Sequence, residues 1–281
     1  MDDAQPAGTL YIVSTPIGHL GDLSPRAVRT LQDVALILAE DTRHSRHLLT
    51  HFGIATPLAS YHEHSEARMA PKLVERLLAG ESLALISDAG TPLLSDPGAR
   101  LVAAAIDAQV AVVPIPGPSA LLAALVASGL PAARFTFFGF LPRKGRERSE
   151  ALREIGATAH TIVIYEAPGR VAATLADLVE SGGGERPAAV ARELTKQFEE
   201  VRRGTVGELA RYYEATPPRG EVVLVIGGAP PVGLDEARLR EHARTLHAEG
   251  LSTRDVARSL IDHHGAPRNL AYRLATLTDE S

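Results

Sequence analysis

The stretch ALISDAGTPLLSDPG, residues 84–98, joins an apolar run to two turns of small residues, each of which carries an aspartate. Residues 83–86 are all apolar, which is typical of a short buried strand. In open α/β sheets, ligands bind at the carboxyl ends of the strands. We therefore predict that Asp88 accepts hydrogen bonds from a ligand amine or hydroxyl. Gly90 and Gly98 are expected to let the ligand approach the backbone closely.

Three other segments follow apolar runs in the same way. They are STPIGHLGD at residues 14–22, EDTR at residues 40–43 and PIPGPSA at residues 114–120. Proline and glycine give the first and third an unusual backbone path, and Asp41 in the second has the position of a helix cap. Capping alone does not account for the neighbouring charges of that segment. Four such loops at strand ends predict a shared pocket for a small molecule.

Apolar runs and helical patterns alternate through most of the chain. This predicts an α/β fold with a mostly parallel sheet and helices on both of its faces. Strands of the first half are expected at residues 10–13, 36–39, 58–60, 83–86 and 110–114. Strands of the second half are expected at residues 135–138, 161–165, 188–191 and 221–226. The expected organisation is an N-terminal α/β domain at residues 8–128, a second α/β domain at 131–229 and a small helical C-terminal module at 234–281.

Composition narrows the class of protein. The 281 residues include no cysteine, which excludes disulfides and cysteine-based zinc or redox sites. The acidic start lacks the features of a signal peptide, and no apolar stretch reaches the ~20 residues that span a bilayer. We therefore expect a soluble, cytoplasmic protein. The familiar nucleotide-binding fingerprints, G-x-G-x-x-G after a strand and the P-loop, are absent.

Histidines recur on one predicted helix, at His44, His47 and His51. Their spacing could present imidazoles to a metal. No H-E-x-x-H arrangement completes such a site, and Arg43 and Arg46 add positive charge to the same turns. A polar helix surface is the favoured interpretation, and we expect no metal.

A net charge of −5 argues against indiscriminate binding to nucleic acid, but it allows local basic patches. One candidate patch is a loop, and the other is the C-terminal module, where a cap and a glycine-proline turn indicate a small helix-turn-helix-like element. The alternatives are a solvated helix face and a dimerisation appendage. The candidate RNA-binding residues are Arg143, Lys144, Arg146, Arg254, Arg268 and Arg273.

Seven motifs occur in register along the chain: TLYIVSTPIGHLGDLSPRA, AEDTR, SDAGTPLLSDPG, PIPGPSALLAAL, FFGFLPRK, YEAPGR and RELTK. With them, the chain strongly resembles the small-subunit ribosomal RNA methyltransferase I family of the tetrapyrrole-methylase superfamily, from about residue 8 to residue 275. The resemblance implies two α/β domains with S-adenosylmethionine between them, and a homodimer. It also implies 2′-O-methylation of a cytidine ribose in the decoding region of 16S rRNA in the small ribosomal subunit. Residues 87–92 replace the superfamily's usual glycine-aspartate-proline loop, which disfavours a corrin or haem-precursor substrate.

The resemblance also assigns site residues. The cofactor-binding residues that it implies are Pro16, Ile17, Asp88, Gly90, Thr91, Ser119, Ala120, Tyr165, Glu166, Arg192 and Gly227. Methyl transfer to a neutral ribose hydroxyl is helped by a base or by a cation that favours the developing alkoxide. For this chemistry we expect Asp41 or Glu193 as base or orienting group, with Arg43 and Lys196 as electrostatic partners.

The sequence does not exclude two other classes of function. One is a methyltransferase that acts on a tetrapyrrole-like small molecule or on a protein side chain, for which the arginine-bearing tail and basic loop have no evident use. The other is a non-catalytic RNA-binding protein, which the ligand-type loops disfavour.

Overall fold

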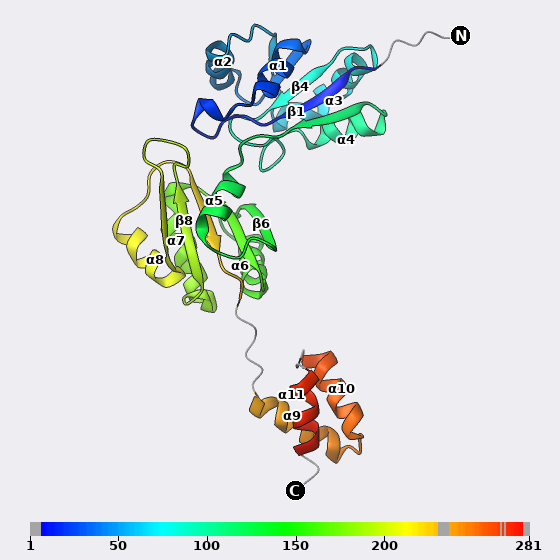
Figure 1. The fold of residues 1–281 in the computed structure, drawn as a ribbon, viewed down its shortest axis with the longest axis vertical. Coiled ribbons are helices and arrows are strands. Elements are labelled where there is room, and N and C mark those ends of the chain that lie inside the picture. The colour runs from blue at the N-terminus through cyan, green and yellow to red at the C-terminus, as the bar shows by residue number, and fades with distance from the viewer. Residues whose placement is uncertain (1–6, 230–235, 265, 267, 278–281) are drawn as a thin grey trace, which may run out of the picture. The chain divides into compact units, whose positions relative to one another are not determined.

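In the computed structural model, residues 7–229, 236–264, 266 and 268–277 are described. The chain divides into two compact units, residues 1–228 and 229–281, and each is described by itself. The expected start of the C-terminal module at residue 234 lies outside the described residues. The first unit contains two five-stranded sheets with their helices, and the described part of the second unit is helical (Figure 1).

The first sheet is entirely parallel, with strand order β3-β2-β4-β1-β5. The predicted parallel sheet is therefore confirmed for the first half of the chain. The strands are β1 (Thr9–Val13), β2 (Leu36–Ala39), β3 (Leu58–Ser60), β4 (Leu83–Ile86) and β5 (Ala111–Ile115). The helices around them are the short η1 (Leu20–Asp22), α1 (Pro25–Asp33), α2 (Thr42–His51), α3 (Glu63–Leu78) and α4 (Ala99–Asp107).

Helices cover both faces of this sheet because its strands are apolar on both sides. One core packs α1 and α2 against alternate strand residues such as Ile37 and Ala84, and the other packs α3 and α4 against residues such as Leu38 and Leu83. Strands buried on both faces are expected in a parallel sheet with crossover helices. Every residue of β2 and β4 is buried accordingly.

The second sheet is mixed, with strand order β6-β7-β10-β8-β9. Only β6 and β7 run parallel; β10 is antiparallel to both of its neighbours, and β9 is antiparallel to β8. The strands are β6 (Phe135–Phe140), β7 (Thr161–Glu166), β8 (Pro187–Arg192), β9 (Glu200–Thr205) and β10 (Val222–Ile226). The helices are α5 (Ala120–Ser128), α6 (Arg146–Ala157), η2 (Pro168–Arg170), α7 (Val171–Leu178), the π-helical η3 (Val179–Gly183) and α8 (Val206–Ala215).

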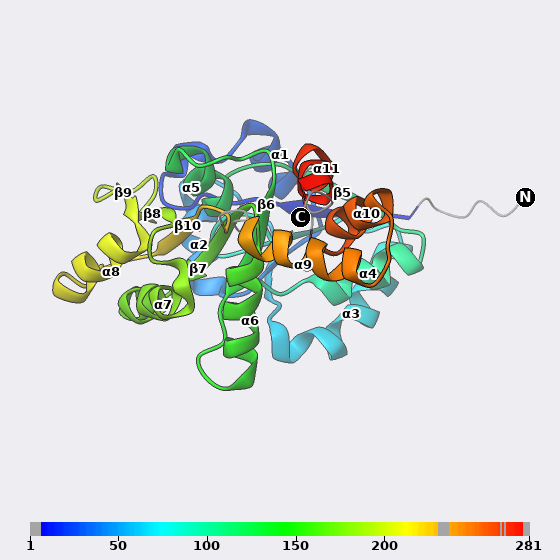
Figure 2. The ribbon, with the colours of Figure 1, turned by 90° about the horizontal axis from the view of Figure 1, so that it is seen from below.

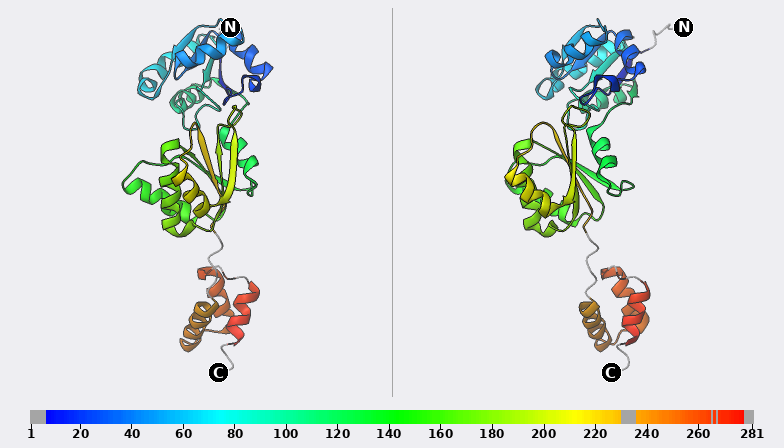
Figure 3. Two further views of the ribbon diagram at one scale, coloured as in Figure 1. Left: turned by 90° about the vertical axis from the view of Figure 1, so that its left-hand side faces the viewer. Right: turned by 60° about the vertical axis from the view of Figure 1, so that its left-hand side comes forward.

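Two of these elements, α5 and β9, were not expected from the sequence. Helix α5 packs on one face of the second sheet, and α6, α7 and α8 pack on the other (Figure 3). The domain boundary that the sequence predicts at residue 128 instead groups α5 with the first domain. Strand β9, EVRRGT, lies at the edge of the sheet. Its charged side chains do not give the apolar pattern that is typical of a buried strand, so the sequence did not predict it.

In its described residues the second unit consists of the helices labelled α9, α10 and α11 in Figure 2, which enclose a hydrophobic core of their own. Leu239, Val256, Leu260 and Leu274 are among the residues buried between its helices. None of the helices in the described part of the chain combines the length and apolar character needed to cross a membrane. The helices are α9 (Glu236–Ala248), α10 (Thr253–His264) and α11 (Arg268–Leu277).

Candidate functional site

The loops after β1, β4 and β5 are fastened to one another at the carboxyl edge of the first sheet. Thr15 and Gly90 exchange two backbone hydrogen bonds, with N···O distances of 2.9 and 3.0 Å. The Thr91 hydroxyl donates to the carbonyl of Pro118 at 3.2 Å. Gly90 has φ of +81°, and a Cβ there would lie 3.4 Å from Ile17 Cγ2, so a side chain at this position would strain the turn. These hydrogen bonds and the positive φ of Gly90 therefore define the geometry of the three loops.

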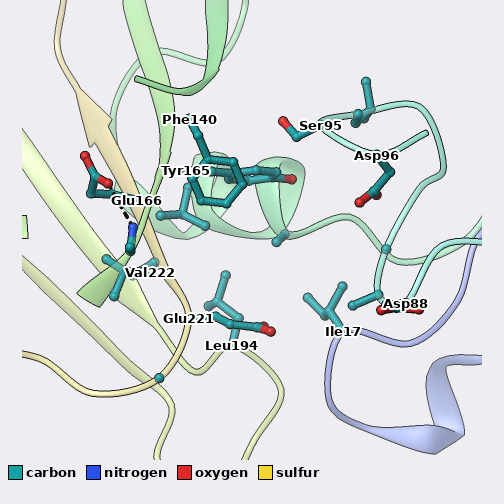
Figure 4. A pocket seen from close by; sticks show the side chains of 18 of the residues that line it. Ile17, Asp88, Ser95, Asp96, Phe140, Tyr165, Glu166, Leu194, Glu221 and Val222 are labelled. Atoms are coloured by element: carbon teal, nitrogen blue, oxygen red, sulfur yellow. Dashed lines mark hydrogen bonds between the residues drawn. The ribbon is translucent and has the colours of Figure 1, made fainter. Parts of the chain in front are cut away.

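These loops border a first cavity of about 430 Å³. Figure 4 shows Asp88 and Asp96 on the side formed by the first sheet's loops, and Phe140 and Tyr165 on the side formed by the second sheet. A pocket of this size with apolar walls and a few polar groups suits a small organic ligand. Its lining residues are Ile17, Glu40, Asp88, Ala89, Gly90, Thr91, Leu94, Ser95, Asp96, Ala120, Phe140, Tyr165, Glu166, Ala167, Pro168, Ala191, Leu194, Gly220, Glu221, Val222 and Val223.

Three carboxylates stand together at one end of the first cavity. Burial, and then the charges of Glu40 and Asp88, raise the pKa of Asp96 to about 7. Burial and the charge of Asp88 also raise the pKa of Glu40. Asp88 accepts a hydrogen bond from the backbone N–H of Asp41 at 3.1 Å, which ties this end of the cavity to the start of α2. Like charges in a partly buried site disfavour ionisation, so this end of the cavity favours a cationic group.

Aromatic rings form the opposite wall. The Tyr165 ring packs edge-on against Phe137, with centroids 4.8 Å apart, and its tilted neighbour Phe140 lies at 5.7 Å. The Tyr165 hydroxyl accepts a hydrogen bond from the N–H of Leu121 at 3.2 Å, at the first turn of α5. Burial raises the pKa of Tyr165. The wall therefore offers mainly apolar aromatic surface to a ligand.

The remaining residues assigned to the cofactor lie in different places. Pro16 lines a second cavity, described below, rather than the first. Ser119 caps α5, where its side chain accepts from the N–H of Leu122 at 3.5 Å. Arg192 is paired with Glu200 at 2.7 Å.

Glu166 lines the first cavity, but its carboxylate has partners within the protein, whereas Gly227 lines neither the first nor the second cavity. The carboxylate of Glu166 is fully buried and accepts hydrogen bonds from the Thr174 hydroxyl at 2.6 Å and the Ala167 N–H at 2.9 Å. Arg170 lies 3.3 Å from it as an ion pair. These partners use the hydrogen-bonding capacity of the Glu166 carboxylate, which in this way stabilises the loop after β7. Gly227 follows the carboxyl end of β10, whereas the first cavity is lined by residues at the amino end of that strand.

The candidate chemical residues form two ion pairs. Asp41 caps α2 through the N–H of Arg43 at 2.8 Å and pairs with the Arg43 side chain at 3.0 Å, and these hydrogen bonds lower the pKa of Asp41 to about 2. The side chain of Arg43 is 91% exposed, and neither residue lines the first or the second cavity.

Glu193 and Lys196 stand nearer the site. The Lys196 ammonium lies 2.9 Å from Glu193 Oε1 and 3.1 Å from Glu221 Oε2. Glu193 also accepts the backbone N–H of Glu221 at 3.0 Å. That N–H and Lys196 lower the pKa of Glu193. A carboxylate held in this way is a weak base, and it is better suited to orienting Lys196 and Glu221.

A second cavity of about 460 Å³ adjoins the first. The two cavities share Ile17, Asp88, Ala89 and Glu221. The second is lined by Pro16, Ile17, Gly18, Leu20, His44, Ser45, His47, Leu48, Ser87, Asp88, Ala89, Lys196 and Glu221. Although His44 and His47 both line it, no group of three or more His, Asp or Glu side chains arranged for a metal is found among the described residues.

The candidate RNA-binding residues lie on the surface of both units. Arg143 and Lys144 are exposed, and Arg146 pairs with Glu150 at 2.6 Å. In the C-terminal unit the exposed arginines are Arg254, Arg268 and Arg273, the last at 3.3 Å from Glu236.

Sequence reasoning did not single out several residues that line the first cavity. The second Ser-Asp turn of residues 84–98 is a repeat of the first, and this repetition was the available signal for Asp96. No comparable signal marks residues 220–223, because they lie at the amino end of a strand, and the sequence patterns indicated ligand groups only at the carboxyl ends of strands.

Comparison with known proteins places this geometry in a family. Residues 9–210 match the sequence family described as Tetrapyrrole (Corrin/Porphyrin) Methylases. The chain is 49% identical over 271 residues to the Ribosomal RNA small subunit methyltransferase I of Synechocystis sp., an alignment that covers 95% of this chain and 97% of that protein. It is 48% identical over 275 residues to the protein of the same name from Pseudomonas aeruginosa, covering 96% and 97%.

Solved structures share the fold at lower identity. Cobalt precorrin-4 methyltransferase, a cobalamin biosynthetic enzyme, superposes with a TM-score of 0.58 at 19% identity, over 78% of this chain and 94% of that chain. Uroporphyrin-III C-methyltransferase from Thermus thermophilus, complexed with S-adenyl homocysteine, gives 0.56 at 20% identity, over 78% and 97%. These two likenesses show the architecture alone. The full-length identities of nearly one half go further: the chain belongs to the tetrapyrrole methylase family and, within it, to the ribosomal RNA small subunit methyltransferase I family.

Proposed function

We propose that this protein transfers a methyl group from S-adenosylmethionine to the 2′-hydroxyl of a cytidine in the decoding region of 16S rRNA. The observation that carries the proposal is the alignment with rRNA small subunit methyltransferases along 95% of the chain. That alignment extends beyond residue 210, where the match to the wider methylase family ends. The helical C-terminal unit is therefore part of what this chain shares with proteins named for rRNA.

The first cavity fits the cofactor in size and in charge. S-adenosylmethionine carries a sulfonium and an ammonium, and the acidic end formed by Glu40, Asp88 and Asp96 attracts both charges. Tyr165 and Phe140 offer aromatic surface, on which an adenine ring can stack. When bound, the cofactor supplies an electrophilic methyl group.

Around the cofactor, the backbone at Gly90 and Ala120 provides peptide groups at the cavity surface, in loops that hydrogen bonds join to one another. Lys196 is the proposed electrostatic partner for the ribose oxygen, because its ammonium lies beside Glu221 where the two cavities meet. A cation there stabilises the oxygen as it loses its proton. Glu193 keeps that cation in place.

A homodimer is the proposed assembly. The outer face of α5 is apolar: Leu122 is 50% exposed and Val126, one turn later, is 74% exposed. Exposed apolar side chains gathered on one face are typical of an interface with another protein. The substrate, ribosomal RNA, implies that the protein acts in the cytoplasm.

Transfer of tritium from labelled S-adenosylmethionine tests the proposal. Purified protein is incubated with small ribosomal subunits, free 16S rRNA, a tetrapyrrole precursor or a protein acceptor, each from cells that lack this activity. We expect label in the RNA of at least one of the two ribosomal substrates. After digestion to nucleosides, the label should co-elute with 2′-O-methylcytidine. Label in a methylated base, or only in the tetrapyrrole or protein, would refute the proposal.

A further inference from the structure

Charge divides the two adjoining cavities. Among the described residues that line the first cavity are five carboxylates, at Glu40, Asp88, Asp96, Glu166 and Glu221, and no lysine, arginine or histidine. The second cavity adds His44, His47 and Lys196 to the two carboxylates, Asp88 and Glu221, that it shares with the first. A cationic ligand therefore favours the first cavity. The second cavity has one ammonium against two carboxylates, but the ring nitrogens of His44 and His47 can donate hydrogen bonds to oxygen atoms of a ligand.

The helix that forms one wall of the second cavity is basic on its exposed side. From residue 42 to residue 57 the sequence contains no aspartate or glutamate. We call the exposed basic side chains of this helix the α2 face. Asp41, which caps this helix, forms an ion pair with Arg43, the first residue of the α2 face. The α2 face consists of Arg43, His44, Arg46, His47 and His51.

A buried hydroxyl in the same wall points to a ligand independently of charge. Ser45 lines the second cavity, is 2% exposed, and its Oγ has no hydrogen-bond partner within the part of the chain that the structure describes. Buried polar atoms are nearly always hydrogen-bonded. A phosphate or ribose oxygen in the cavity would provide the missing partner once the Ser45 side chain turns toward it, because the Oγ itself is buried in the structure.

From these observations we propose that the second cavity and the α2 face bind the RNA backbone beside the target nucleotide. Ser45, His44 and His47 contact phosphate or ribose oxygens, and the target ribose is delivered to the boundary formed by Ile17, Ala89 and the two shared carboxylates. The inference rests on the proposed function. It gives a second role to the histidines, whose spacing alone indicated only a polar helix surface.

Charge reversal on α2 tests the inference. The double variant His44→Glu/His47→Glu keeps the helix, because acidic residues are favourable near a helix N-terminus. We expect its KM for small-subunit RNA to rise at least about 10-fold, with the affinity for S-adenosylmethionine in calorimetry unchanged. His44→Arg/His47→Arg should keep or lower KM. Ser45→Ala should raise KM by about 3- to 10-fold, the effect of removing one hydrogen bond.

A matched control separates local contact from general charge. Arg26 and Arg29 are exposed on α1 with the same spacing of three residues, and neither lines the first or the second cavity. The variant Arg26→Glu/Arg29→Glu removes more positive charge than the α2 variant, yet its KM should stay within about 3-fold of the wild type. An equal rise in both double variants, or a wild-type KM in the α2 variant, would overturn the inference and leave the proposed function standing. Failure of the wild type to methylate RNA while it binds the cofactor would overturn both.

Discussion

Replacing Asp96 with asparagine should stabilise the protein without ligand and weaken its hold on the cofactor. In the folded chain the pKa of Asp96 lies near 7, against an ordinary 3.8, because of burial and the charges of Glu40 and Asp88. Ionised Asp96 is therefore disfavoured in the folded state relative to the unfolded state. Stability is greatest where the carboxyl is protonated in both states, and it falls as pH rises from about 4 through about 7.

The size of the effect follows from that difference. A shift from 3.8 to about 7 corresponds to about 4 kcal/mol above pH 7, at about 1.4 kcal/mol per pKa unit. Asp96 lines an open cavity, where solvent screens part of the interaction, so we expect roughly half of this. Asp96→Asn should raise the free energy of unfolding by about 2 kcal/mol at pH 8 and by less than about 1 kcal/mol at pH 4.

Urea denaturation followed by circular dichroism measures both values on the full chain. Asp107→Asn is the matched control, because Asp107 is exposed at the last residue of α4 and should change stability by under about 0.5 kcal/mol at either pH. A gain for Asp96→Asn that is the same at pH 4 and pH 8 would show that improved packing, and not charge, is responsible. No gain at pH 8 would refute the reasoning outright.

Four further predictions concern binding and turnover. The affinity for S-adenosylmethionine should fall as pH drops below about 7, because protonation of Asp96 removes an attractive charge, and calorimetry on Asp96→Asn should show a weaker affinity that no longer varies in this range. Glu193→Gln should lower kcat by ~10²-fold or more with cofactor affinity preserved, because Lys196 then keeps only one of its two charged partners, Glu221; the same fall in Asp41→Asn instead would assign the role to Asp41. Removing residues 234–281 should leave cofactor binding intact and abolish methylation of small subunits. The exposed arginines of the tail are Arg254, Arg268 and Arg273. If they bind phosphates, replacing each one with alanine should reduce the slope of the log–log plot of subunit affinity against salt concentration by about 0.7–0.9, and filter binding measures this slope. If instead a dimer dissociates in size-exclusion chromatography while the slope is unchanged, the tail is an assembly element.

The sequence by itself determined the first sheet and the loops that end its strands. Runs such as residues 83–86 are apolar throughout, and strands separated by helical segments pair in parallel. The carboxyl ends of parallel strands all lie at one edge of the sheet. The turn that contains Asp88 and the loop that contains Ile17 are therefore neighbours at that edge. The motifs that carry the family resemblance lie largely in these loops, which is why family and pocket could be recognised together.

Only the tertiary structure decided what the second sheet contributes. Strand β10 is antiparallel to β7 and β8, so its amino end, at residues 220–223, reaches the first cavity, and Gly227 lies at the far end. An apolar run such as residues 222–226 has the same pattern in either direction, because side chains alternate identically along both.

The chemical state of each site residue was also decided in three dimensions. Asp96 lies in a Ser-Asp turn like that of Asp88, but its pKa is raised by burial and then by the charges of Glu40 and Asp88, which the sequence pattern does not reveal. Glu166 has the sequence position of a ligand contact, but Thr174 and Arg170 occupy its carboxylate. Ionisation and hydrogen bonding depend on distances through space, and a linear sequence fixes those only between near neighbours in the chain.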